Sequence, residues 1–164
     1  MFNSTIAIKS SVILEKEKIA WPELIKFYLS PSFSFYRPKV DILIDGQKYL
    51  LKTASDKSEL LKAFVLRAEV FLETKSIESD CFDRFCDHLI IIDKSSGDVV
   101  GTYRLYHSDD ALNSEFGHYS ESEFNIDAFK KFPGKKLELG RAAIAPSHRN
   151  GFLIDILWKE IAKY

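Results

Sequence analysis

Cysteine, long apolar runs and net charge are all scarce in this sequence of 164 residues. Its two cysteines are too few for a disulfide-stapled fold, which indicates a reducing cytosol. No apolar run approaches the roughly 20 residues that a membrane helix needs, and residues 1–11 show no signal-peptide pattern. The net charge of −1 excludes a nucleic-acid binder that works by bulk charge. We therefore expect a cytoplasmic protein, neither secreted nor membrane-spanning.

Apolar and charged side chains, by contrast, are plentiful, at 46 % and 29 % of the residues. This composition predicts a soluble globule with one domain's worth of core. The charges are unevenly distributed. Residues 69–129 carry four basic and fourteen acidic side chains, whereas residues 130–164 carry eight basic and three acidic ones. These blocks are either solvated faces, or a site for a cationic substrate group next to a surface for an anionic partner.

Residues 1–48 are interpreted as an N-terminal arm and residues 49–164 as the main domain. Pro22 suits a helix start, so a short amphipathic helix is predicted over residues 21–29. Three aromatic side chains follow in a proline-bounded loop: Phe33, Phe35 and Tyr36. We expect the arm to pack these aromatics on the main domain, and a membrane-surface contact is the alternative.

The main domain alternates strand and helix patterns. We predict a strand over 48–53, a helix opened by a capping box at Ser55, Asp56 and Glu59, a strand over 88–92, a turn over 94–98 and a strand over 99–107. A polar excursion over 108–135 with a short helix at 127–131, a strand over 136–144 and a helix over 152–164 complete the order. The long helix has an apolar stripe: Leu60, Leu61, Phe64, Val65, Ala68, Phe71 and Leu72. This order predicts an α/β fold.

The step from the last strand through Gly151 into the last helix is a candidate anion site. A helix start presents unpaired backbone amides and a positive dipole end. His148 and Arg149 would add charge there. Glu138 and Arg141 lie three apart on that strand and face opposite sides unless a bulge or turn at Gly140 intervenes. They are either a buried ion pair or a base beside a substrate-binding guanidinium.

The segment after the long helix concentrates negative charge, with Asp80 and Asp83 next to Glu78 and Asp87. It could bind a cation, an ammonium substrate or only water. Cys81, Cys86 and His88 match no zinc-ligand spacing, so no metal is expected. No nucleophile elbow, P-loop or dinucleotide fingerprint occurs.

A series of short motifs runs through residues 49–164. They are residues 66–71 (LRAEVF), 80–83 (DCFD), 88–89 (HL), 101–105 (GTYRL), 122–124 (SEF), 137–141 (LELGR) and 148–151 (HRNG), the last leading into 156–158 (ILW). In this order they resemble the ornithine–acyl-carrier-protein N-acyltransferases that begin ornithine-lipid synthesis. The series is more distantly similar to acyl-homoserine-lactone synthases and N-acyl amino acid synthases. All belong to the Gcn5-related N-acyltransferase (GNAT) superfamily.

The resemblance implies a GNAT-like acyl-CoA N-acyltransferase fold, a twisted mixed sheet with flanking helices whose central strands splay to admit an acyl-pantetheine arm. It implies transfer of a fatty acyl group from an acyl-carrier-protein thioester, or from acyl-CoA, to the amine of an amino acid such as ornithine. The implied catalytic residues are Glu138, as base, Arg141 and Arg104. The implied substrate-binding residues are Arg67, Phe71, Asp80, Asp83 and Phe124. The implied donor-binding residues are Ile144, His148, Arg149, Asn150 and Gly151.

The chemistry of these residue types agrees with that assignment. An ammonium must lose a proton before it attacks, which a carboxylate base and an acidic pocket serve. The thioester oxygen gains charge and needs backbone amides of the last strand. Arg104 and Arg141 could orient the substrate carboxylate or hold the acidic loop in place. Five basic residues would suit an acidic carrier protein, or form a solvated loop: Lys130, Lys131, Lys135, Lys136 and Arg149. We expect no nucleic-acid partner.

Three departures from the family pattern bear on the hypothesis. His148 stands where Gln or Arg is usual and Leu153 where a small residue is usual, which favours carrier-bound pantetheine over free coenzyme A. The tryptophan of lactone synthases is absent before the acidic loop, which weakens the autoinducer-synthase alternative. The family continues with further strands beyond the last helix, so we expect a fragment or truncated product without the distal strands, or a site completed by another chain. A non-catalytic module that binds acyl carrier protein is the remaining alternative.

Overall fold

The computed structural model describes residues 19–164, so the predicted absence of a signal pattern in residues 1–11 lies outside the described residues. Its centre is a five-stranded sheet in which every strand lies beside its successor in the chain. The strands are β1 (Leu43–Asp45), β2 (Tyr49–Thr53), β3 (Asp87–Asp93), β4 (Asp98–His107) and β5 (Leu137–Ile144). The predicted α/β class is confirmed, and β1 is a strand that the sequence pattern did not indicate.

The sheet differs in one respect from the mixed sheet that the resemblance implied. All four pairings between the described strands are antiparallel. A parallel pair needs a crossover connection that returns to the same end of the sheet. Here each connection, whether a hairpin, the long helix or the polar excursion, leads directly to the neighbouring strand.

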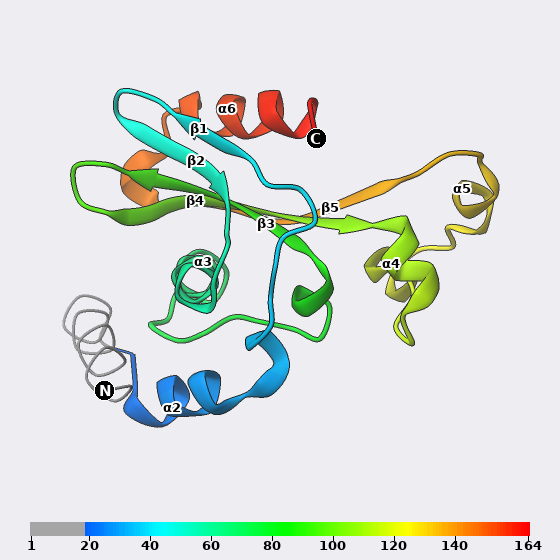
Figure 1. The fold of residues 1–164 in the computed structure, drawn as a ribbon, viewed down its shortest axis with the longest axis horizontal. Helices are drawn as coiled ribbons and strands as arrows, with labels where there is room; N and C mark the ends of the chain where they lie inside the picture. Colours follow the sequence, from blue (N-terminus) through cyan, green and yellow to red (C-terminus); the bar gives the residue numbers. More distant parts are fainter. Residues whose placement is uncertain (1–18) are drawn as a thin grey trace.

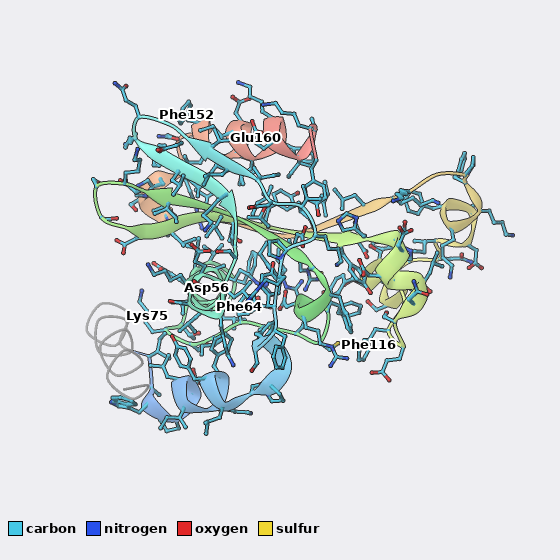
Figure 2. The ribbon with its side chains drawn as sticks, viewed as in Figure 1. Asp56, Phe64, Lys75, Phe116, Phe152 and Glu160 are labelled. Atoms are coloured by element: carbon cyan, nitrogen blue, oxygen red, sulfur yellow. The ribbon has the colours of Figure 1, made fainter. Side chains whose placement is uncertain are left out.

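The long helix α3 (Lys57–Phe71) begins as its capping box predicts. The Asp56 side chain accepts hydrogen bonds from the backbone N–H groups of Ser58 and Glu59. In return, Glu59 Oε2 accepts from the Ser55 N–H at 2.8 Å. These bonds satisfy amides that the first helical turn leaves unpaired. Figure 2 labels Asp56 at this end of the helix.

Two helices cover opposite faces of the sheet (Figure 1). Successive strand residues point to opposite faces. Ile90 of β3 therefore packs with α3, whereas Leu89 and Ile91 pack with α6 (Phe152–Ile161). The apolar stripe of α3 is buried from Leu60 to Ala68, but Phe71 and Leu72 are exposed because no described residues cover the last turn. That part of the predicted stripe is wrong.

The helix α2 (Trp21–Leu29) matches the prediction and forms a further layer outside α3 (Figure 1). Phe27 and Phe33 of this segment pack on Phe64 of α3, with ring centroids 6.1 and 5.4 Å away. Figure 2 labels Phe64 in this region. Tyr36 is buried as well, whereas Phe35 is 92 % exposed. The expected packing of the aromatics therefore holds for two of the three loop residues and is wrong for Phe35.

Residues 108–135 extend beyond the end of the sheet (Figure 1) and carry α4 (Ser108–Asn113) and α5 (Asp127–Lys131). A short 3-10 helix, Tyr119–Ser122, lies between them. The predicted excursion and its helix at 127–131 are confirmed. Across residues 19–164, no helix combines the length and apolar character required to cross a membrane.

Asp87, at the start of β3, joins the segment before β1 to Tyr164. Its carboxylate accepts hydrogen bonds from the backbone N–H groups of Lys39 and Val40, each at 2.9 Å. It also accepts one from the Tyr164 hydroxyl at 2.6 Å. Because Asp87 is buried, these three donors replace the water that its charge would otherwise need.

Candidate active site

A bulge in β5 determines where its charged side chains point. Thr102 of β4 faces Ala143 and Arg104 faces Gly140, so two residues of β5 oppose one residue of β4. Arg141 lies in the bulge with a left-handed φ of 54°. Such a bulge adds a residue to one strand and redirects a side chain. Glu138 and Arg141 consequently both contact Tyr119. The Glu138 carboxylate accepts a hydrogen bond from the Tyr119 N–H, and Arg141 donates one to the Tyr119 hydroxyl. The interpretation of these two side chains as a buried ion pair with each other is wrong.

Three arginines and three carboxylates form one charge network. Arg67 and Asp83 make a bidentate pair at 2.7 and 3.1 Å, and Arg67 also pairs with Glu78. The other pairs are Arg104 with Asp80 at 2.7 Å and with Asp83 at 3.1 Å, and Arg141 with Glu78 at 3.0 Å and with Asp80 at 3.2 Å. The acidic segment is thus neutralised by arginines of α3, β4 and β5. Arg104 and Arg141 both hold the acidic loop, which is one of the two roles expected of them.

Burial makes this pairing necessary. Arg67 and Asp83 are 0 % exposed and Arg104 is 3 % exposed. Burial, the largest single effect, would raise the pKa of Asp83, but the neighbouring Arg67, together with Arg104 and the other groups around it, holds that pKa below its usual range. Asp83 is therefore an ionised partner of arginine and is not accessible to a substrate ammonium. The predicted substrate-binding role of Asp83 is replaced by one in fixing the loop.

His88 lies beneath the network and is fully buried. Its Nε2 lies 3.0 Å from the Asp83 carbonyl oxygen, so Nε2 carries the hydrogen that this oxygen accepts. Its Nδ1 has no hydrogen-bond partner among the described residues. Burial lowers the pKa of His88 below its usual value despite the nearby Asp83. The ring is thus neutral at physiological pH.

Glu138 anchors the Tyr119–Ser122 turn to β5. Its two carboxylate oxygens accept hydrogen bonds from the N–H of Tyr119 at 2.9 Å and the N–H of Ser120 at 2.7 Å. The Ser120 hydroxyl donates a third bond. The turn holds Tyr119 so that its ring lies 5.1 Å from the Arg104 guanidinium carbon and its hydroxyl 3.1 Å from Arg141.

A small cavity of about 150 Å³ opens between this turn and the sheet. Its lining residues are Arg104, Tyr106, Tyr119, Ser120, Glu123, Phe124, Glu138, Leu139 and Gly140. Three of the predicted site residues, Arg104, Glu138 and Phe124, therefore meet around one space. Within the described residues Arg104 uses only Nη1 for hydrogen bonds. A Cβ placed on Gly140 would lie 3.8 Å from both Nε and Nη2 of Arg104, so these two donors face the cavity wall at Gly140.

The candidate donor-binding residues lie apart from this cavity, at the turn from β5 into α6. Gly151 adopts a left-handed φ of 80° that starts the helix. Asn150 Oδ1 accepts from the Phe152 N–H at 3.1 Å, and the Arg149 Nε donates to the Ile144 carbonyl at 3.2 Å. His148 is held by Asp93 at 3.2 Å. These contacts shape the turn, and the next amides of the first helical turn have no partner within the helix.

Sequence reasoning named Glu78 only as a neighbour in the acidic segment, and it omitted Tyr119. Glu78 links Arg67 to Arg141, and Tyr119 joins Arg104 and Arg141 through its ring and hydroxyl. The acidic run around Asp80 was a signal for Glu78, whereas nothing in the pattern marked Tyr119. Phe71, in contrast, is exposed at the end of α3 and does not line the cavity. Within residues 19–164 no three His, Cys, Asp or Glu side chains are grouped to hold a metal ion.

Comparison with known protein families assigns the chain to one of them. Residues 61–159, from α3 to α6, match the acetyltransferase (GNAT) domain. This match covers more than half of the chain and therefore shows its family. The chain belongs to the GNAT family, which confirms the resemblance and the α/β class expected from it.

Several curated relatives are more specific. The chain is 35 % identical over 126 residues to an L-ornithine N(alpha)-acyltransferase of Agrobacterium fabrum. The aligned region covers 66 % of this chain and 43 % of that protein. It is 32 % identical over 133 residues to the Rhodobacter capsulatus protein of that name, with 71 % and 51 % covered. It is 33 % identical over 140 residues to that of Rhizobium meliloti, with 74 % and 47 % covered. The chain thus spans about half the length of these relatives. No solved structure matches it.

Proposed function

We propose that this protein transfers a fatty acyl group from a carrier thioester to the α-amine of an amino acid such as ornithine, as in the first step of ornithine-lipid synthesis. Membership of the GNAT family supports the reaction class, and the relatives' names support the acceptor. The structural observation that carries the proposal is the cavity that is lined both by Arg104, whose Nε and Nη2 make no hydrogen bond among the described residues, and by the anchored carboxylate of Glu138.

On the acceptor side, Arg104 binds the carboxylate of the amino acid. Its Nε and Nη2 form the fork that matches a carboxylate with two parallel hydrogen bonds. The acceptor's α-ammonium then lies near Glu138, whose carboxylate accepts three hydrogen bonds and retains further lone-pair capacity. Glu138 takes the ammonium proton, directly or through a water molecule, and frees the amine lone pair.

The amine nitrogen then attacks the thioester carbonyl carbon. A carbon–nitrogen bond forms, the carbon–sulfur bond breaks, and the leaving thiolate takes up a proton to give the free thiol. Charge develops on the carbonyl oxygen in between. β5 is the edge of the described sheet, so every second N–H group of this strand points away from β4 and is placed to receive that charge.

On the donor side, the phosphate of the pantetheine arm binds at the turn from β5 into α6. The amides of the first turn of α6 and the side chain of Arg149 supply the positive end. An acidic carrier protein docks on the basic side chains of α5 and the segment after it. Among them, Lys135 has 86 % of its side chain exposed. Acyl-CoA, whose phosphates fit the same turn, is the competing donor.

The acylated product is an amphiphile. The exposed apolar side of α2 provides a surface beside which it is released. Trp21, Ile25 and Leu29 are spaced by four residues on one side of α2 and are 57 %, 49 % and 79 % exposed. We propose a peripheral membrane contact there. Sedimentation with phospholipid vesicles tests it. Binding that Trp21→Ala leaves unchanged would contradict it.

The function is tested by incubating the purified protein and ornithine with either an acyl thioester of acyl carrier protein or acyl-CoA. We expect release of free thiol together with a mass-spectrometric acyl-ornithine peak. Arg104→Lys should raise the KM for ornithine at least tenfold, because lysine cannot offer the fork. Lys159→Gln, on the exposed side of α6, is the control. Thiol release without an acyl-amino acid, or a lactone in place of it, would exclude the proposal.

A further inference from the structure

The cavity beside Arg104 is lined by one exposed carboxylate that has no ion-pair partner among the described residues. Three charged residues line it: Arg104, Glu123 and Glu138. Arg104 is paired with Asp80 and Asp83, and the Glu138 carboxylate is held by the N–H groups of Tyr119 and Ser120. Within residues 19–164 the Glu123 side chain has neither a hydrogen bond nor an ion pair. The cavity therefore favours a ligand that presents a cationic group to Glu123 in addition to an anionic group for the Arg104 fork.

The position of Glu123 is fixed by its backbone. It ends the 3-10 helix, where its N–H donates to the Ser120 carbonyl at 3.2 Å. The following N–H, of Phe124, donates to the same carbonyl at 2.9 Å. Ser120 in turn is tied to β5 through Glu138. Glu123 thus lines the cavity from a turn that is attached to the sheet, and not from a free loop.

The walls between the two charged ends are aromatic and apolar. Tyr106, Tyr119, Phe124 and Leu139 supply them. The volume of about 150 Å³ equals about five water molecules at ~30 Å³ each, which suits one free amino acid better than a peptide. A short aliphatic chain along these walls would bury apolar surface while its ends meet opposite charges.

We propose that Glu123 binds the side-chain ammonium of the acceptor and restricts the enzyme to diamino acids. This inference rests on the proposed function, since it places the acceptor carboxylate on Arg104. With the carboxylate at the fork and the distal ammonium at Glu123, the α-amine is the nitrogen left beside Glu138. The same ion pair therefore selects the acceptor and decides which of its two amines reacts.

The test compares L-ornithine with L-norvaline, which has the same carbon chain without the side-chain amine. We expect the protein to prefer ornithine by at least tenfold in kcat/KM. Glu123→Gln should lose this preference through a higher KM for ornithine, while the value for norvaline stays unchanged. A purely structural role would lower both values together. Glu115→Gln, which removes a charge from the same excursion outside the cavity, should retain the preference.

Equal use of both acceptors by the unmodified protein would overturn the assignment, as would an ornithine preference that survives in Glu123→Gln. Calorimetric titration with the same two amino acids separates this inference from the proposed function. If ornithine is bound and norvaline is not, but no acyl transfer occurs, the reaction is wrong and the subsite stands. If both bind alike or neither binds, the subsite is wrong whatever the transfer assay shows.

Discussion

At the residue scale, the buried Arg67–Asp83 pair decides whether the acidic loop can lie against the sheet. Taking two charges out of water is costly, and the cost is offset only when every partner is present. Here Asp83 meets Arg67 and Arg104 and also accepts the N–H of Asp80 at 2.7 Å. Each partner is therefore needed by the others, and removing one leaves an uncompensated charge in the interior.

We predict that Asp83→Asn lowers the free energy of unfolding by about 3–5 kcal/mol, because Arg67 and Arg104 lose their shared carboxylate. Urea denaturation followed by circular dichroism measures this value. Asp127→Asn, which changes an exposed carboxylate of α5, serves as the matched control and should leave the transition midpoint in place. A small effect of Asp83→Asn would mean that the network does not support the fold.

Stability should also fall on acidification, in two windows. His88 has a lowered pKa in the folded state, so the unfolded chain binds a proton first and stability decreases as the pH falls below about 6.5. Asp83 also has a lowered folded pKa, and its contribution is lost only below about pH 4. Unfolding curves recorded from pH 8 to 3 measure both. Replacement of His88 by Gln should flatten the first window and spare the second.

At the element scale, local hydrogen bonds position α3 and a bulge positions β5. The Asp56 cap starts α3 so that Arg67, eleven residues later, reaches the acidic loop. The bulge at Arg141 turns that guanidinium toward the same loop. Both elements thus deliver an arginine to Glu78, one from each side.

Asp56→Ala should destabilise the protein by about 1 kcal/mol, the usual cost of a lost N-cap. Thermal unfolding monitored at 222 nm gives the change. Asparagine accepts the same hydrogen bonds, so Asp56→Asn should retain most of the stability. An equal loss in both variants would show that the charge, and not the cap, is what matters.

The sequence pattern predicted elements better than contacts. The capping box and alternating apolar residues located α3, β3, β4 and β5, because these signals are local. The bulge required a left-handed φ at Arg141, a residue that carries no such preference, so the shared direction of Glu138 and Arg141 was not predictable. Tyr119 contacts Arg104 and Arg141 through tertiary folding of a polar excursion that has no periodicity. Arg104 was predicted as a site residue. The sequence did not predict that its Nη1 pairs with the acidic loop while its Nε and Nη2 make no hydrogen bond among the described residues.

At the scale of the whole molecule, two apolar clusters lie on opposite faces of one sheet, and α2 extends the α3 side by a further layer. Phe27 is the main link of that layer, since its ring contacts both Phe33 and Phe64. The outer side of α2 remains apolar and exposed. One side of α2 therefore packs on the domain, and the opposite side is exposed among the described residues.

We predict that Phe27→Ala costs about 3–5 kcal/mol, as truncation of a buried phenylalanine usually does. Chemical denaturation compared with the unmodified protein measures it. Phe35→Ala, at a side chain that is 92 % exposed, should have no measurable effect. If the two variants behave alike, α2 does not share the core of the domain.

The three bonds on Asp87 have a consequence for motion. The segment before β1 and Tyr164, three residues past the end of α6, share one carboxylate at the start of a central strand. Opening of either terminal segment leaves that charge with fewer donors and so weakens the hold on the other. Amide hydrogen exchange should therefore show Val40 and the last turn of α6 exchanging as one cooperative unit. Anything that orders the last turn of α6 would then also reduce the opening of the segment before β1.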